Sequence, residues 1–163
     1  MVNLAFGDQV QGLKSGAIDA AFPPAPFTEQ IRRDGTADYF GGPLTPGAAS
    51  VGTVFGPSLV KDRPGVAARV MMALVRAARD LQGAGIKSDA NLAIFEKYVR
   101  LPIDTLRTMD PYDYEPNLRP DAATLTDMQQ VFIAEGLLRF AAPIPADRYI
   151  DESYANTAAS AVR

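Results

Sequence analysis

Two stretches of the chain carry side chains that could contact a small molecule. The first is Phe22-Pro23-Pro24-Ala25-Pro26-Phe27, in which two aromatic residues flank a proline-rich loop. Proline restricts the backbone, so a loop of this kind loses little conformational entropy when it binds a ligand. We therefore interpret Phe22, Pro24, Ala25, Pro26 and Phe27 as candidate ligand-binding residues. The alternative is a turn whose two phenylalanine side chains belong to the hydrophobic core.

The second stretch contains Ser50 and Thr53, separated by Val51 and Gly52. Serine and threonine hydroxyls both donate and accept hydrogen bonds, so these two side chains could hold a polar ligand. The alternative is an ordinary β-strand with one buried face.

An acidic group near residue 113 has the composition of a metal site but not the spacing. Asp110, Asp113 and Glu115 are interleaved with Tyr112 and Tyr114. Carboxylate oxygens at this density could hold Ca²⁺, but the spacing does not match an EF-hand loop and no glycine stands at the expected turn. We interpret the segment as a solvated loop and predict no metal site.

Paired arginines offer a further candidate chemistry, which is the binding of anions. Arg32 and Arg33 are adjacent, and Arg76 and Arg79 are three residues apart. On amphipathic helices such residues usually form the solvated face. We interpret them in this way and leave the anion site as the alternative.

Composition excludes several kinds of catalysis. The 163 residues include no cysteine and no histidine, so this chain supplies no thiolate nucleophile, no Ser-His-Asp triad and no imidazole metal ligand. The net charge is −3, without a Lys/Arg stripe of the kind that binds nucleic acids. Any catalysis would have to use carboxylates, lysine, tyrosine or a Ser-Lys pair, and we expect no nucleic-acid partner.

The elements that would position these residues read as an α/β fold in the first third of the chain. Short apolar runs at residues 2–6, 18–22, 37–40 and 50–55 predict β-strands, with helices between the first three. Residues 57–163 are predicted to be mostly helical. The predicted division is therefore an α/β lobe at 1–56 and a helical segment at 57–163.

Capping residues predict where the helices begin and end. A first helix runs between Asp8 and Gly16, and a second runs from Pro26 to Gly35. Further helices are expected to begin at Pro64, Ser88, Ile103, Pro120 and Asp151.

Several short motifs, taken in order, resemble the periplasmic substrate-binding proteins of ABC importers, in the nitrate/sulfonate/taurine and thiamine-precursor group. They are the segment from Leu13 to Phe22 with its Gly-Ala-Ile-Asp-Ala sequence, Ala25-Pro26-Phe27, Asp62-Arg63-Pro64 before an Ala-rich helix, Glu135-Gly136-Leu137-Leu138, and Ile150-Asp151-Glu152-Ser153-Tyr154. At the position of Ala25 the family often has a glutamate, and this departure puts an amine-bearing ligand in doubt.

The resemblance implies a partial type II periplasmic-binding-protein fold, in which a small β-α-β lobe precedes helices that cover a lobe absent from this chain. It implies a protein that is not an enzyme and needs no cofactor. Such a protein captures a small organic molecule or anion, with the loop aromatics stacked on it, and delivers it to a membrane permease. The intact protein would then be periplasmic, although Met1-Val2-Asn3-Leu4 does not read as a signal peptide. Two alternatives remain open. One is a freestanding ligand-sensing or dimerising domain, with a homodimer through the exposed face of the lobe. The other is half of an enzyme similar to thiamine-pyrimidine synthases, whose active-site histidine this chain lacks.

Overall fold

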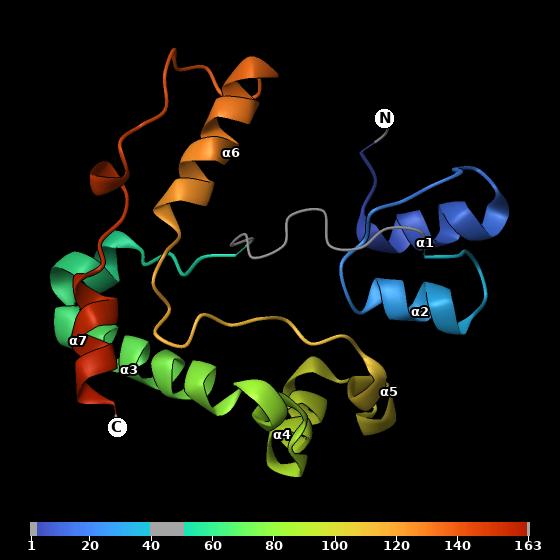
Figure 1. The fold of residues 1–163 in the computed structure, drawn as a ribbon, viewed down its shortest axis with the longest axis horizontal. Helices are drawn as coiled ribbons and strands as arrows, with labels where there is room; N and C mark the ends of the chain where they lie inside the picture. The colour runs from blue at the N-terminus through green and yellow to red at the C-terminus, as the bar shows by residue number, and fades with distance from the viewer. Residues whose placement is uncertain (1–2, 40–50, 163) are drawn as a thin grey trace. The chain divides into compact units, whose positions relative to one another are not determined.

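The computed structural model describes residues 3–39 and 51–162, and the regular elements in these ranges are all helical (Figure 1). The α-helices are α1 (Phe6–Ser15), α2 (Phe27–Arg33), α3 (Pro64–Asp80), α4 (Asp89–Val99), α5 (Ile103–Thr108), α6 (Ala122–Ala134) and α7 (Ser153–Ala161). One turn of π-helix, η1 (Ser58–Asp62), and two 3₁₀ segments, η2 (Gly83–Lys87) and η3 (Ala146–Arg148), complete the described elements.

The predicted α/β fold is therefore wrong, because none of the described residues forms a β-strand. The β-α-β lobe and the type II periplasmic-binding-protein fold fall with it. The first apolar run instead leads into α1, and the run beginning at Ile18 is irregular. Val51 and Val54, which were expected to lie in a β-strand, are 88% and 91% exposed. Short apolar runs carry no periodicity that distinguishes a strand from an apolar loop or helix end, which explains the error.

Contacts group the chain into two compact units that alternate along the sequence. Unit 1 combines the described residues of Met1–Leu44 with Lys87–Pro111, and unit 2 combines those of Thr45–Ile86 with Tyr112–Arg163. This grouping does not follow the predicted boundary between residues 56 and 57. Each unit has its own small hydrophobic core, described separately below.

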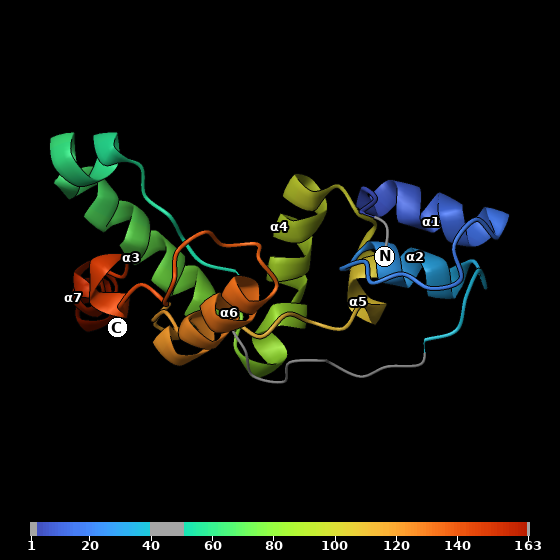
Figure 2. The same cartoon turned by 90° about the horizontal axis from the view of Figure 1, so that it is seen from above.

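Unit 1 contains α1, α2, α4 and α5. In it α1 lies beside α2, and α4 packs on α5 (Figures 1 and 2). One side chain each from α1, α2 and α4 is fully or almost fully buried, namely Val10, Ile31 and Leu92. An ion pair also joins α1 to the end of α2, with 2.9 Å between the Lys14 Nζ and an oxygen of Asp34.

The end of α1 explains why no strand follows it. Gly16 adopts φ of +69°, a left-handed conformation that glycine reaches without strain, and it terminates the helix as predicted. The amides of Ala17 and Ile18 then donate to the carbonyl oxygen of Gly12. The Ile18 side chain lies directly over Gly12. The apolar residue that was expected to open a strand thus folds back onto the preceding helix.

Unit 2 is built around α3 and α7, which pack along each other (Figure 1). Its core contains Met71 and Val75 from α3 with Ala158 from α7 and Val162 just after it. Alanines on both helices allow the two backbones to approach closely. The long amphipathic helix beginning at Pro64 is therefore confirmed, with the proline in its first turn as expected.

Side-chain caps confirm two more of the predicted helix starts. The Ser88 hydroxyl accepts a hydrogen bond from the amide of Asn91 at 3.3 Å and so begins α4. The carboxylate of Asp121 accepts one from the amide of Thr124 at 3.1 Å and begins α6. The short helix after Leu101 and the last helix after Asp151 are also present, as α5 and α7.

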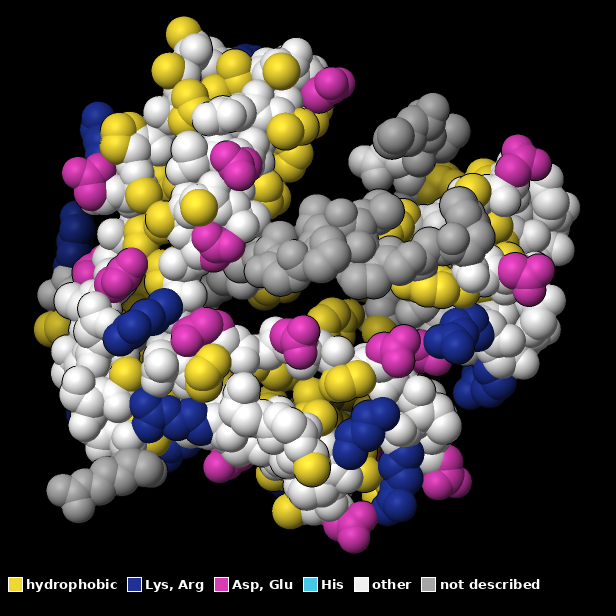
Figure 3. Space-filling model, viewed as in Figure 1, with side chains coloured by type: hydrophobic (Ala, Val, Ile, Leu, Met, Phe, Trp, Pro, Cys, Tyr) yellow, Lys and Arg dark blue, Asp and Glu magenta, His cyan; other side chains and the backbone are white. Residues whose placement is uncertain are grey.

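Within unit 2, α6 and the segment after it expose an unusual amount of apolar surface (Figure 3). The side chains of this α6 surface are between 37% and 70% exposed, and they are Met128, Val131, Phe132, Leu137, Phe140 and Ile144. Gln129 ties the helix to the following segment, because its amide accepts from the amide of Ile144 and donates to the Tyr149 hydroxyl. Within the described ranges no helix has both the length and the apolar character required to span a membrane.

Candidate functional site

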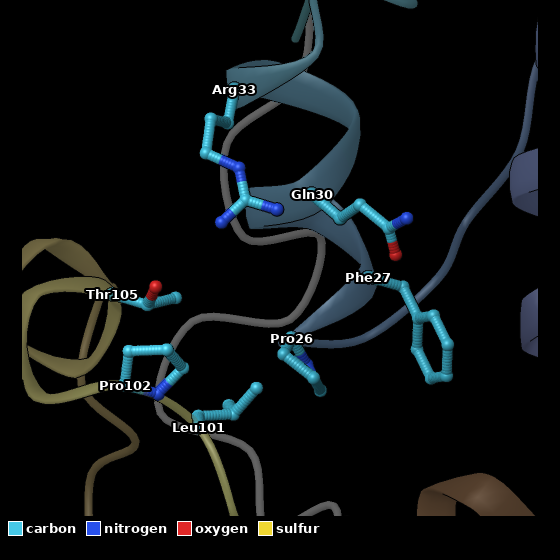
Figure 4. Close-up of a pocket in the computed structure, with 7 residues that line it drawn as sticks. All are labelled: Pro26, Phe27, Gln30, Arg33, Leu101, Pro102 and Thr105. Atoms are coloured by element: carbon cyan, nitrogen blue, oxygen red, sulfur yellow. The ribbon is translucent and has the colours of Figure 1, made fainter.

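Unit 1 contains a cavity of about 270 Å³ between α2 and the start of α5 (Figure 4). This volume lies slightly below the range of about 300 to 1,000 Å³ that is usual for small-molecule sites. Four of the lining residues are apolar and three are polar or charged, and together they are Pro26, Phe27, Gln30, Arg33, Leu101, Pro102 and Thr105.

The α2 residues of the cavity follow one another at intervals of about one helical turn. Phe27 and Gln30 are three residues apart, as are Gln30 and Arg33, so each pair is adjacent on the helix surface, but Phe27 and Arg33 point in different directions. Leu101 and Pro102 precede α5 directly, and Thr105 lies in its first turn. The chain must therefore bring together two segments about seventy residues apart in sequence.

Polar contacts hold the α5 side of the cavity in place. The Lys87 ammonium donates to the carbonyl oxygen of Arg107 at 2.7 Å, and the Arg107 guanidinium pairs with Asp89 at 2.7 Å. Arg32 lies 3.8 Å from a carboxylate oxygen of Asp110, which follows α5, and so links it to α2. All three contacts involve exposed side chains, so they orient the segment more than they stabilise it.

Arg33 dominates the electrostatics of the cavity, since no other lining residue is charged. Its Nε lies 3.7 Å from Asp34, and its side chain is 65% exposed. The pKa of the Asp34 carboxyl is lowered, mainly because it accepts a hydrogen bond from Lys14, with Arg33 adding a smaller effect in the same direction. The carboxylate beside Arg33 is thus already bound by a second cation.

The orientation of the side chains divides the lining into two parts (Figure 4). The guanidinium of Arg33 extends into the space between Thr105 and Pro26, and the Leu101 and Pro102 side chains lie on the opposite side of that space. The ring of Phe27 points away from it. That ring packs against Phe6 of α1, with 5.9 Å between the ring centroids.

The structure places two of the predicted site residues, Pro26 and Phe27, in the lining of this cavity. Ala25 precedes it and is joined to Pro26 by a cis peptide bond. Phe22 is 76% exposed and Pro24 is also exposed; neither lines the cavity.

The second predicted stretch does not join the first. Thr53 belongs to unit 2 and is exposed. Ser50 lies outside the residues that the structure describes.

Five of the seven lining residues were not predicted as a site. Arg33 was considered as an anion site but interpreted as part of a solvated face, although it lies one helical turn after Gln30, which in turn lies one turn after Phe27. Gln30 could have been found by the same periodicity. For Leu101, Pro102 and Thr105 the sequence carries no such signal, because their approach to α2 depends on tertiary packing.

The carboxylates near residue 113 do not form a metal site in the part of the chain that the structure describes. No three Asp or Glu side chains among residues 3–39 and 51–162 lie close enough to hold a metal ion. Glu115 instead accepts hydrogen bonds from the backbone amides of Asn117 and Arg119. A second hollow lies on unit 2, but a single face of α7 lines it, through Asn156, Thr157, Ser160 and Ala161.

Comparisons of the chain with protein-family models, with curated proteins and with solved structures find no match. The features of the molecule that bear on function are therefore the cavity of unit 1 and the exposed apolar surface of unit 2.

Proposed function

We propose that this chain binds a small molecule, without covalent chemistry, in the cavity of unit 1. The observation that carries the proposal is the lining itself, in which the apolar side chains of Leu101 and Pro102 lie across from the Arg33 guanidinium. Pockets that bind small molecules usually combine these two features, with the apolar part supplying affinity and the polar part fixing orientation. The candidate loop residues Pro26 and Phe27 support the proposal from the sequence.

The test is a titration followed by nuclear magnetic resonance, with small anionic, cationic and neutral compounds. A compound that binds here shifts the amide signals of Gln30 and Thr105. Thr105→Trp places a bulky ring in the cavity and abolishes these shifts, whereas Thr108→Trp, an exposed position on the same helix, preserves them. If no compound in the panel shifts these signals at millimolar concentration, the proposal is wrong.

A role in import through an ABC permease, and a periplasmic location, remain predictions that depend on the short motifs alone. The fold that would have supported them is absent from the described residues. Small-molecule capture does not require that fold, since a cavity between helices can hold a ligand by itself.

The exposed surface of unit 2 favours a second candidate function, which is self-association. Met128, Val131 and Phe132 share one face of α6 by their spacing, and the neighbouring Leu137 and Ile144 are also exposed. Isolated exposed hydrophobic residues are ordinary, but several large ones along one helix and the segment after it are more typical of an interaction surface. Asp127 is the one charged residue of α6, so most of this helix could pack against a second copy without bringing like charges together. We propose that a second copy of the chain covers this α6 surface.

Sedimentation velocity tests the self-association. The wild-type chain of 17.5 kDa is expected to sediment as a dimer at tens of micromolar. Val131→Asp places a charge in the interface and yields a monomer, while Gln130→Asp adds the same charge beside it and leaves the dimer intact. A wild-type chain that stays monomeric at 100 µM would refute this second proposal (roughly the concentration at which weak specific dimers form).

A further inference from the structure

The cavity in unit 1 presents a cation whose binding capacity is only partly used. Arg33 approaches Asp34 through Nε, and its two terminal nitrogens project into the space between Thr105 and Pro26 (Figure 4). None of the seven lining residues carries a carboxylate. A positive charge without a negative charge in the same lining favours a negatively charged ligand.

The shape of the guanidinium narrows the type of anion. Arginine presents parallel N–H groups in a plane, which match the two oxygens of a carboxylate in a bidentate pair. The Thr105 hydroxyl borders the same space and could donate a further hydrogen bond.

The other lining residues indicate the polarity and the size of the rest of the ligand. Pro26, Leu101 and Pro102 contribute apolar surface and no charge, so they complement a body without a second charged group. A volume of about 270 Å³ leaves room for a body no larger than one ring or a short chain.

We propose that the ligand is a small monocarboxylate, with its carboxylate on Arg33 and its apolar body against Pro26, Leu101 and Pro102. This inference rests on the proposed ligand-binding function of the cavity. The ligand class follows from one arginine facing an apolar wall, and it differs from an inorganic anion, which would leave that wall uncovered.

The experiment compares benzoate with benzamide, which has nearly the same shape but no charge. Binding to the full chain is measured by the shifts of the Gln30 and Thr105 amide signals. Benzoate is expected to bind about 10-fold more tightly, as typical of one charge-assisted hydrogen-bonded pair near the surface. Arg33→Gln removes this difference. Lys97→Gln, which removes a positive charge at an exposed position of α4 outside the cavity lining, keeps it, and circular dichroism checks that both variants stay folded.

The outcomes separate the ligand class from the underlying function. If benzoate and benzamide bind equally well, or if Arg33→Gln keeps the preference for benzoate, the proposed recognition of a carboxylate by Arg33 is wrong. The proposal that the cavity binds small molecules would still stand. If inorganic phosphate binds as tightly as benzoate, the cavity recognises charge alone. That result overturns the proposed contact between an apolar ligand body and Pro26, Leu101 and Pro102. Absence of binding by every compound tested refutes the proposed function itself.

Discussion

The guanidinium of Arg79 in α3 donates a hydrogen bond to the backbone carbonyl of Ala159 in α7 over 2.9 Å, across 80 residues of sequence. The same side chain also bonds the carbonyl of Val162 and, at 2.7 Å, the side-chain oxygen of Asn117. The last carbonyl groups of a helix have no hydrogen-bond partner within it. A cation placed there donates hydrogen bonds to them and interacts favourably with the negative end of the helix dipole. Arg79 of α3 therefore caps the C-terminal end of α7 and joins the two helices.

We predict that Arg79→Gln lowers the free energy of unfolding by about 2 kcal/mol, because it removes charge-assisted bonds to partly buried carbonyls. Urea denaturation measures the change. Arg76→Gln, three residues earlier and exposed, is the matched control and should change stability by less than about 0.5 kcal/mol. An equal loss of unfolding free energy in the two variants would contradict the role of Arg79 in joining α3 to α7.

The core of unit 1 predicts a strong effect at Leu92, which is 1% exposed. Leu92→Ala leaves a cavity beneath α4 and is expected to destabilise the chain by about 3 kcal/mol. Ile94→Ala, on the same helix but 54% exposed, removes similar apolar volume at a cost below about 1 kcal/mol. Thermal denaturation of both variants checks the difference, and a tolerated Leu92→Ala would mean that α4 does not bury this face.

The cap of α4 predicts a smaller effect. Ser88→Ala leaves the amide of Asn91 without its hydrogen bond and should cost about 1 kcal/mol. Ser88→Asp keeps an acceptor at the same place and should restore the loss. Circular dichroism measures the helix content of both variants, and urea denaturation measures their stability. If Ser88→Ala is as stable as Ser88→Asp, the side chain at this position does not cap α4.

The Asp34 carboxyl predicts a dependence of stability on pH. Its pKa is lowered by the Lys14 hydrogen bond, so it binds its proton less readily in the folded state than in the unfolded state, whose usual value is 3.8. The stabilisation is thus present above that value and is lost as the pH falls through the lower folded pKa. Carbon-13 titration of Asp34 should give a midpoint below 3.8, and Lys14→Met should raise it. A midpoint unchanged by Lys14→Met would exclude the pairing.

Helices were predictable because their ends carry local chemistry. Gly16, Pro64 and Ser88 each satisfy or remove backbone groups at a helix end, and such effects depend only on nearby residues. The strands were not predictable in this way, since a strand needs a partner elsewhere in the chain to bond its backbone. Runs such as Val2-Asn3-Leu4-Ala5-Phe6 contain no information about whether a partner exists.

The candidate site shows the same limit. The loop prolines and aromatics drew attention to Pro26 and Phe27, which do line the cavity. The expected stacking of aromatics on a ligand does not follow, because the Phe27 ring turns toward Phe6. Leu101 and Thr105 complete the lining from a distant segment, and only the packing of α5 near α2 reveals them.

Asp34 serves as a common counter-ion for Lys14 and Arg33, through different carboxylate oxygens. Because Arg33 approaches Asp34 through Nε, an anion bound to its terminal nitrogens would share the guanidinium with Asp34. Asp34 would then lie between a ligand-bearing arginine and the lysine of α1, so its carboxyl signal could report the occupancy of a cavity that it does not line.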